Sequence, residues 1–311
     1  MAARLTPAET ARLTRRITLL SIAAAAVLVT IKLAAWLASG STALLASMAD
    51  SALDLIASLI TAFAVRYAAA PPDAEHRFGH GKAEAFASLL QAGLVFASAA
   101  LIVREAIADL TDPQPIEHSV WAAGVMVVST ILTLALITAQ SHVLRRVSSV
   151  AVAGDRAHYL SDLASNVIAL AGIAAAAWFG VVGFDAAAAI LVAVLLLWSA
   201  IGVFQQASNQ LMDHELPETN RAEIVRLALA DGQLANVHQL RTRASGPFIH
   251  IQMHADLDPD LTLDAAHRAI VAAENRILEA YPAADILIHA DPRGRAEPHG
   301  GAFAEAVAGT Q

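Results

Sequence analysis

Six apolar segments dominate the first two thirds of this sequence, each close to the roughly 20 residues that an α-helix needs to cross a bilayer. They cover residues 17–37, 42–65, 85–103, 120–138, 160–181 and 186–204. Hydrocarbon offers the backbone no hydrogen-bond partners, so such segments must satisfy their own N–H and C=O groups as helices. Only 15% of the 311 residues are charged, against about 25% in an average soluble domain. The sequence therefore predicts an all-α bundle of six transmembrane helices over residues 17–206, preceded by a cytoplasmic segment of residues 1–16.

Basic residues alternate between the connecting segments and predict the orientation of the bundle. They gather before the first span, after the second and after the fourth, at Arg4, Arg12, Arg15, Arg16, Arg66, Arg77, Lys82, Arg145, Arg146 and Arg156. The short segments 39–41 and 182–185 on the opposite side carry none. Since Lys and Arg are retained on the cytoplasmic side, an even number of spans places both termini in the cytoplasm. We expect a multi-pass protein of the inner (cytoplasmic) membrane.

A small soluble domain is predicted over residues 207–292. Pro217 opens an amphipathic helix at 218–230, and Thr262 is the expected N-cap of a second one that ends at 280. Alternating apolar residues predict strands at 239–242, 248–254 and 285–289, the first two joined by a turn at 244–247. The order α-β-β-α-β is typical of a two-layer α+β fold. Residues 293–311, rich in Gly, Ala, Glu and Pro, are expected to form a disordered tail.

Two pairs of metal-ligand residues lie in or beside the spans. Asp50 and Asp54 are four residues apart, as are His158 and Asp162, so each pair shares one helix face with Cβ atoms about 5–6 Å apart. A carboxylate at membrane depth costs about 2.5–3.5 kcal/mol, which a shared cation offsets. Without Cys, one imidazole and three carboxylates suit tetrahedral Zn²⁺ at about 2.0–2.2 Å, while Fe²⁺, Cd²⁺ and Mn²⁺ stay open. Helix capping or hydrogen bonding within the bundle is the alternative explanation.

Two further clusters have ligand spacing. Asp73, His76 and His80 lie in a glycine-containing cytoplasmic loop, where incidental solvated His residues are the alternative. In the soluble domain we expect one or two metal ions at His238, His254, His267, His289 and Asp291, because the start of one hairpin strand lies near the end of the next. Isolated His residues of this kind more often serve as surface or core residues. We assign structural or surface roles to His118, His142, His214, His250 and His299.

Four motifs together resemble the cation diffusion facilitator family of divalent-metal transporters, and most nearly its bacterial ferrous-iron/zinc efflux subgroup. They are Asp50-x-x-x-Asp54, Phe78-Gly-His-Gly-Lys-Ala-Glu84, His158-Tyr-x-Ser-Asp162 and His238-x-Leu-Arg-Thr-Arg-x-Ser-Gly-Pro. The resemblance implies a homodimer of six-span protomers, each with a ferredoxin-like, metallochaperone-like cytoplasmic domain. It also implies alternating-access export of a divalent metal, Zn²⁺ first, against inward proton flow.

The resemblance assigns the three clusters separate roles. It implies a transport site at Asp50, Asp54, His158 and Asp162, and a loop site at Asp73, His76 and His80. The remaining cluster, His238, His254, His267, His289 and Asp291, is implied to be a cytoplasmic binuclear site, where the metal is a structural or regulatory ligand.

Other classes of function compete with transport. A membrane metal sensor would signal through the soluble domain without moving an ion, although sensing needs no ligands deep in the spans. An intramembrane metallohydrolase would need an open coordination position, and the sequence has no His-Glu-x-x-His motif. The net charge of −8, concentrated in the acidic C-terminal third, disfavours a nucleic-acid partner. We therefore expect a transporter, not an enzyme.

Overall fold

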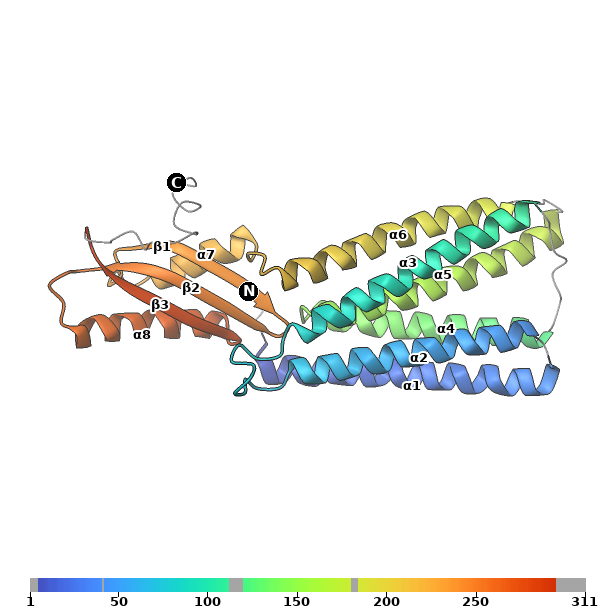
Figure 1. Ribbon diagram of the computed structural model, residues 1–311, viewed down its shortest axis with the longest axis horizontal. Coiled ribbons are helices and arrows are strands. Elements are labelled where there is room, and N and C mark those ends of the chain that lie inside the picture. The colour runs from blue at the N-terminus through green and yellow to red at the C-terminus, as the bar shows by residue number, and fades with distance from the viewer. Residues whose placement is uncertain (1–4, 41, 112–119, 180–183, 295–311) are drawn as a thin grey trace. The chain divides into compact units, whose positions relative to one another are not determined.

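The computed structural model describes residues 5–40, 42–111, 120–179 and 184–294 of the protein (Figure 1). The chain divides into two compact units, one formed by Ala8–Leu211 and the other by Met1–Pro7 with Met212–Gln311. Residues 295–311 of the predicted tail, and with them His299, lie outside the described residues, as does His118.

The first unit consists of long helices. They are α1 (Pro7–Ser39), α2 (Thr42–Ala68), α3 (Ala83–Thr111), α4 (Val120–Leu144), α5 (Val150–Phe179) and α6 (Phe184–Leu211). Each is longer than the apolar segment that predicted it, and α5 begins ten residues before its predicted span of 160–181. Gly40 ends α1 with a backbone φ of 68°, a left-handed conformation that glycine adopts without strain. Within the described residues, five of these helices are long and apolar enough to cross a membrane. The sixth span, in α5, stays a prediction.

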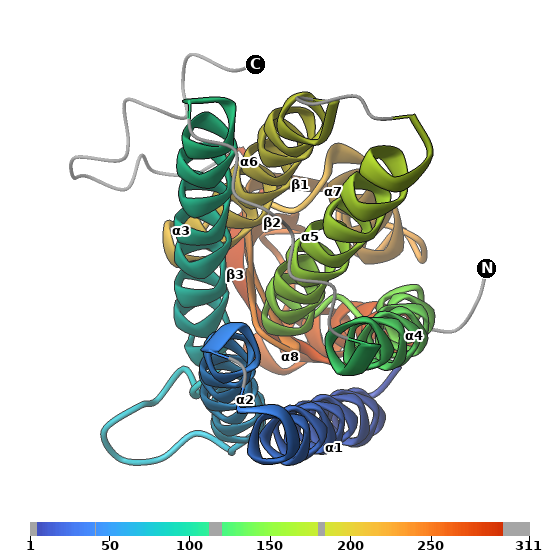
Figure 2. The same ribbon diagram turned by 90° about the vertical axis from the view of Figure 1, so that its right-hand side faces the viewer.

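Viewed along the bundle, α1, α2, α3, α6, α5 and α4 follow one another around its axis (Figure 2), and α3 packs against both α5 and α6. Large apolar side chains point outward, as at Phe63 and Trp198, which are 69% and 74% exposed. Small residues such as Ala99 and Ala151 are fully buried between the helices. Apolar surfaces facing lipid and small residues at helix contacts are typical of membrane bundles.

The second unit has the predicted order α7 (Glu218–Ala228), β1 (Asn236–Ser245), β2 (Phe248–Leu257), α8 (Leu263–Ala280) and β3 (Ala284–Pro292). The sheet order is β1-β2-β3, with β1 antiparallel and β3 parallel to β2. The alternation of β2 turns Ile251 and Met253 into a core shared with Ile224 and Ile277 of the two helices. Thr262 caps α8 by accepting a hydrogen bond from the Ala265 N–H, as predicted.

The strands are longer than the sequence predicted, because ladder pairing continues into the expected turn. Ala244 pairs with Ile249 and Ser245 with Phe248, so the turn at 244–247 was predicted too wide. An irregularity of β1 lies between His238 and Arg241, where Gln239 adopts a φ of 50°. Such a bulge re-aims the residues beside it. The bulge shifts the pairing of β1 with β2 by one residue and so sets His238 directly opposite His254.

Candidate metal centres

The bundle brings together Asp54 of α2 with His158 and Asp162 of α5. The Nε2 atom of His158 lies 2.8 Å from Asp54 Oδ1 and 3.8 Å from Asp162 Oδ2. Asp54 and His158 are only 6% and 5% exposed. Because the α5 pair is one helical turn apart, both of its side chains face α2. One imidazole and two carboxylates from two helices thus converge on one point.

Two atoms of this group have spare coordination capacity. Among the described residues, His158 Nδ1 and Asp162 Oδ2 are buried and take part in no hydrogen bond. Buried polar atoms are normally satisfied, so an orphaned carboxylate oxygen beside an imidazole is evidence for a ligand. The donor set of nitrogen and oxygen atoms fits Zn²⁺ and related divalent ions.

Asp50, the fourth predicted ligand, lies one helical turn before Asp54 on α2. The ligand atoms of Asp54, His158 and Asp162 all lie within 4.8 Å of one another, and the carboxylate of Asp50 is outside this group. A rise of 5.4 Å per turn separates the two α2 carboxylates along the axis. Asp50 nevertheless interacts electrostatically with both Asp54 and His158, so it lies beside the group.

Lys32 of α1 is a buried lysine that interacts electrostatically with Asp50 and Asp162. It is 8% exposed, and its Nζ donates hydrogen bonds to Ser51 Oγ at 2.6 Å and to the Ser47 carbonyl at 3.2 Å. A lysine within an apolar span either snorkels to the interface or pairs within the bundle. The structure shows pairing, with α2 as the partner.

The loop between α2 and α3 folds Asp73, His76 and His80 into a second group. Asp73 Oδ2 lies 3.2 Å from His80 Nε2, and Asp73 Oδ1 lies 3.4 Å from His76 Nδ1. The His76 backbone N–H donates to Asp73 Oδ1 at 2.6 Å and holds the pKa of this carboxyl below its usual value. Gly79, with a φ of 78°, allows the chain to turn between the two imidazoles. The three predicted loop ligands are therefore neighbours in the structure.

The third group forms on the face of the sheet opposite the core. His238, His254 and Asp291 have ligand atoms within 4.8 Å of one another. His254 Nδ1 lies 2.8 Å from Asp291 Oδ2, and the ring of His289 lies 4.7 Å from that of His254. Two or three imidazoles around one buried carboxylate form a donor set that suits Zn²⁺.

Two residues of this domain depart from the sequence interpretation. His267 is exposed on α8 and is not among the grouped ligand atoms, because Ala269, Ala273 and Ile277 define the core-facing side of that helix. Asp256, which the sequence interpretation passed over, lies with its Oδ1 3.4 Å from His238 Nε2. Its signal was available, since Asp256 is two residues after His254 and so shares its strand face.

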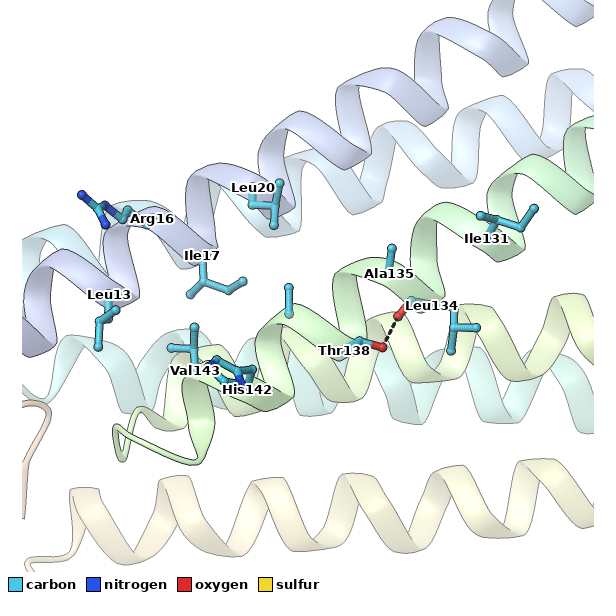
Figure 3. Close-up of a pocket in the computed structure, with 11 residues that line it drawn as sticks. Leu13, Arg16, Ile17, Leu20, Ile131, Leu134, Ala135, Thr138, His142 and Val143 are labelled. Carbon is cyan, nitrogen blue, oxygen red and sulfur yellow. Dashed lines mark hydrogen bonds between the residues drawn. The ribbon is translucent and has the colours of Figure 1, made fainter. Parts of the chain in front are cut away.

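The remaining His residues in the described chain lie apart from these groups. His250 contacts Asp285 of β3 at 3.1 Å and His214 the Glu215 carbonyl. His142 lines a cavity of about 930 Å³ between α1 and α4, whose walls are mostly apolar side chains such as Leu20 and Ile131 (Figure 3). None of the predicted ligands lines this cavity.

Comparison with known proteins gives agreeing matches for both units. The family model described as the cation efflux transmembrane domain matches residues 18–212, and the one described as the cytoplasmic domain of cation efflux proteins matches residues 216–293. The cation-efflux pump FieF of Salmonella choleraesuis is 37% identical over 281 residues, which cover 90% of this chain and 93% of the pump. FieF of Salmonella newport has the same identity and coverage. A solved structure of CzrB in its zinc form shares 27% identity over 27% of this chain and 98% of its own, with a TM-score of 0.25.

Proposed function

The chain belongs to the cation efflux family, the group of metal transporters that its motifs resemble, and on this premise we propose that it exports a divalent transition-metal ion in exchange for protons. Zn²⁺ is the first candidate for the ion, and Fe²⁺, Cd²⁺ and Mn²⁺ share its ligand preferences closely enough to follow. Membership of this family establishes that the chain is a cation efflux transporter. The metal and the coupling to protons are the proposal.

The observation that carries the proposal is the group formed by Asp54, His158 and Asp162 inside the helical unit. Its acidic side chains are costly at membrane depth, and a divalent cation neutralises them. Asp50, one turn along α2, completes a proposed transport site of one nitrogen and three oxygen donors. Since imidazole and carboxylate ligands bind metal only when deprotonated, metal and protons compete for the same atoms. This competition would couple the export of the metal to the inward movement of protons.

The proposed cycle alternates access to the two sides of the membrane. A cytoplasmic ion displaces protons from the ligands, the bundle rearranges to open outward, and external protons displace the ion and return with the empty carrier. Each proton that moves inward contributes about 2.3 kcal/mol per 100 mV of membrane potential. The distribution of Lys and Arg supports the orientation in which both termini are cytoplasmic.

The other two groups complete the proposal. We assign a regulatory or structural metal to the cytoplasmic domain, at His238, His254, His289 and Asp291, with His267 retained as a proposed ligand of that domain. The loop group of Asp73, His76 and His80 is a second candidate site for a cytoplasmic ion. We also propose a homodimer, because the second family model describes a domain typical of dimeric efflux proteins.

The test is uptake of Zn²⁺ into inverted vesicles that carry an imposed pH gradient. We expect uptake that collapses when the gradient is dissipated and that Asp162→Asn abolishes. The matched control is Asp260→Asn, the same change at an exposed position in the second unit, which is expected to transport normally. Wild-type uptake by Asp162→Asn refutes the site, and uptake indifferent to the gradient refutes the coupling. A pure membrane sensor moves no ion in this assay.

A further inference from the structure

A second buried carboxylate, Asp155, lies on α5 three residues before His158 and outside the ligand group. It is 1% exposed and is held by neutral donors from three other helices. Gln140 Nε2 donates to its Oδ2 at 2.8 Å, and Gln91 Nε2 and Ser58 Oγ donate to its Oδ1 at 3.3 and 3.4 Å. Asp155 is therefore fixed at the meeting point of α2, α3, α4 and α5.

The hydrogen bonds around Asp155 continue to the remaining neighbour helix and to its own. The hydroxyls of Ser58 and Tyr159 share a hydrogen bond at 2.8 Å, and the Tyr159 hydroxyl oxygen lies 3.4 Å from the carbonyl of Ser21 on α1. Gln140 Nε2 also lies 3.2 Å from Ser21 Oγ. Such polar contacts between spans are commonly worth about 0.6 kcal/mol each, so a network of this extent needs a reason beyond stability.

No Lys or Arg side chain hydrogen-bonds to Asp155 among the residues that the structure describes, and His158 is the basic group that acts on it from a distance. The ionisable groups that act on it are His158 of its own helix and Asp54 of α2, together with Tyr159. The neighbours from α1, α3 and α4 (Ser21, Gln91 and Gln140) are neutral. A buried charge that no cation contacts directly is costly, and a proton is the smallest ligand that removes it.

The two glutamine side chains can serve both protonation states of Asp155. Their Oε1 atoms are buried and accept no hydrogen bond from the described residues. With the amides as placed, their nitrogens donate to an ionised carboxylate. Rotation of either amide by half a turn presents its oxygen, which accepts a hydrogen bond from a protonated carboxyl group. The surroundings therefore suit a carboxyl group that alternates between the two states.

Asp155 is close enough to the ligand group to respond to its occupancy without being part of it. Side chains three residues apart on a helix lie about 5–6 Å from each other at Cβ. Asp155 itself makes no hydrogen bond or ion pair with Asp54, His158 or Asp162 in the described structure. A divalent ion bound at His158 favours the ionised form of Asp155 by Coulomb attraction, and its departure favours the protonated form.

We propose that Asp155 is a proton-binding site separate from the metal ligands, which releases its proton when metal binds to the transport group and takes one up when metal leaves. The proposal rests on the proposed function, since it names a carrier of the exchanged protons. In this role Asp155 binds a proton and couples its release to metal binding, without coordinating the metal itself.

The test measures protons released per Zn²⁺ bound by the full-length protein in weakly buffered detergent solution, as a function of pH. A background with Asp73→Ala and Asp291→Ala removes the carboxylates of the loop and cytoplasmic groups. In that background, Asp155→Asn is expected to bind Zn²⁺ but to release up to one proton fewer per ion than the parent. Asp260→Asn is the matched control and is expected to release as many as the parent.

A second variant keeps the test decisive if Asp155→Asn does not fold. Gln140→Leu removes the donor nearest to Oδ2 and is expected to move the additional proton release to higher pH, because the ionised carboxylate loses a hydrogen bond. A structural role alone leaves that pH unchanged. The same proton release by Asp155→Asn and the parent, or an unshifted profile for Gln140→Leu, overturns the proposal. Failure of the parent background to bind any metal contradicts the proposed function instead.

Discussion

Gly154→Ala should loosen the contact between α3 and α5 that positions the ligand group. Gly154 lies on α5, four residues before His158. A Cβ atom built there lies 3.1 Å from Gln91 Cβ, 3.1 Å from Ser88 Oγ and 3.2 Å from Ser88 Cα. Carbon atoms pack best at about 3.5–4.0 Å. The Ser88 hydroxyl can rotate away, but its Cα is backbone, so the two helices must separate by several tenths of an ångström.

The expected cost combines two effects of opposite sign. Overpacking a close contact costs about 1–3 kcal/mol, whereas replacing a helical glycine by alanine gains about 0.5–1 kcal/mol. We therefore expect Gly154→Ala to lower the free energy of unfolding by up to about 2.5 kcal/mol. Because His158 and Asp162 follow on the same helix, the shift should also weaken Zn²⁺ binding.

Gly202→Ala provides the matched control, since Gly202 is also helical and its built Cβ meets nothing within 4 Å. Its expected change is a gain of about 0.5–1 kcal/mol. Both variants can be compared with the parent by SDS titration in mixed micelles, with Zn²⁺ affinity measured in parallel. Equal stability of the two variants refutes the close-contact argument. A weakened Gly154→Ala protein with unchanged Zn²⁺ affinity refutes the link to the ligands.

Three further predictions concern the second unit. Arg276 donates hydrogen bonds to the carbonyls of Leu227 and Ala228 at the end of α7 and to Asp231. Arg276→Leu should therefore lower the free energy of unfolding by about 1.5–3 kcal/mol, which faster amide hydrogen exchange in α7 would report. Burial raises the pKa of Asp231, but hydrogen bonds from the Gln233 N–H and from Arg276 outweigh it and leave the pKa below its usual value. The charged form of Asp231 therefore stabilises the fold above the pKa of the unfolded chain. The difference in amide hydrogen exchange between the parent and Asp231→Asn should accordingly disappear below about pH 4. At the cytoplasmic cluster, Asp256→Asn should weaken Zn²⁺ binding about 10–100-fold as an outer partner of His238, and Asp291→Asn more strongly, in calorimetric titrations. An Asp256→Asn protein that binds like the parent removes Asp256 from the site.

Much of this architecture could be predicted because local patterns determine it. Apolar runs of span length indicated the helices, and alternation along residues 248–254 indicated which side of β2 faces the core. Spacings of four placed His158 and Asp162 on one face. Strand pairing likewise placed His254 beside His238, although the bulge at Gln239 that brings them into register has no signal in the sequence pattern.

What the sequence left undetermined depends on contacts between elements. Which carboxylate of α2 approaches His158 is set by the rotation and height of two packed helices, and the structure selects Asp54 while Asp50 lies a turn away. Asp155 was overlooked because it has no ligand residue four positions from it, although an acidic residue in an apolar helix is itself a signal. His267 stays a proposed ligand, although its position relative to Ala269 and Ala273 places it on the exposed side of α8.

The most direct test of the central claim is X-ray absorption spectroscopy of Zn²⁺ in the protein with Asp73→Ala and Asp291→Ala, loaded with one ion per protomer. We expect a first shell of one nitrogen and three oxygen neighbours at about 2.0–2.2 Å, and loss of the bound ion in His158→Ala. A shell with several imidazole nitrogens, or one that His158→Ala leaves unchanged, contradicts a transport site built from Asp50, Asp54, His158 and Asp162.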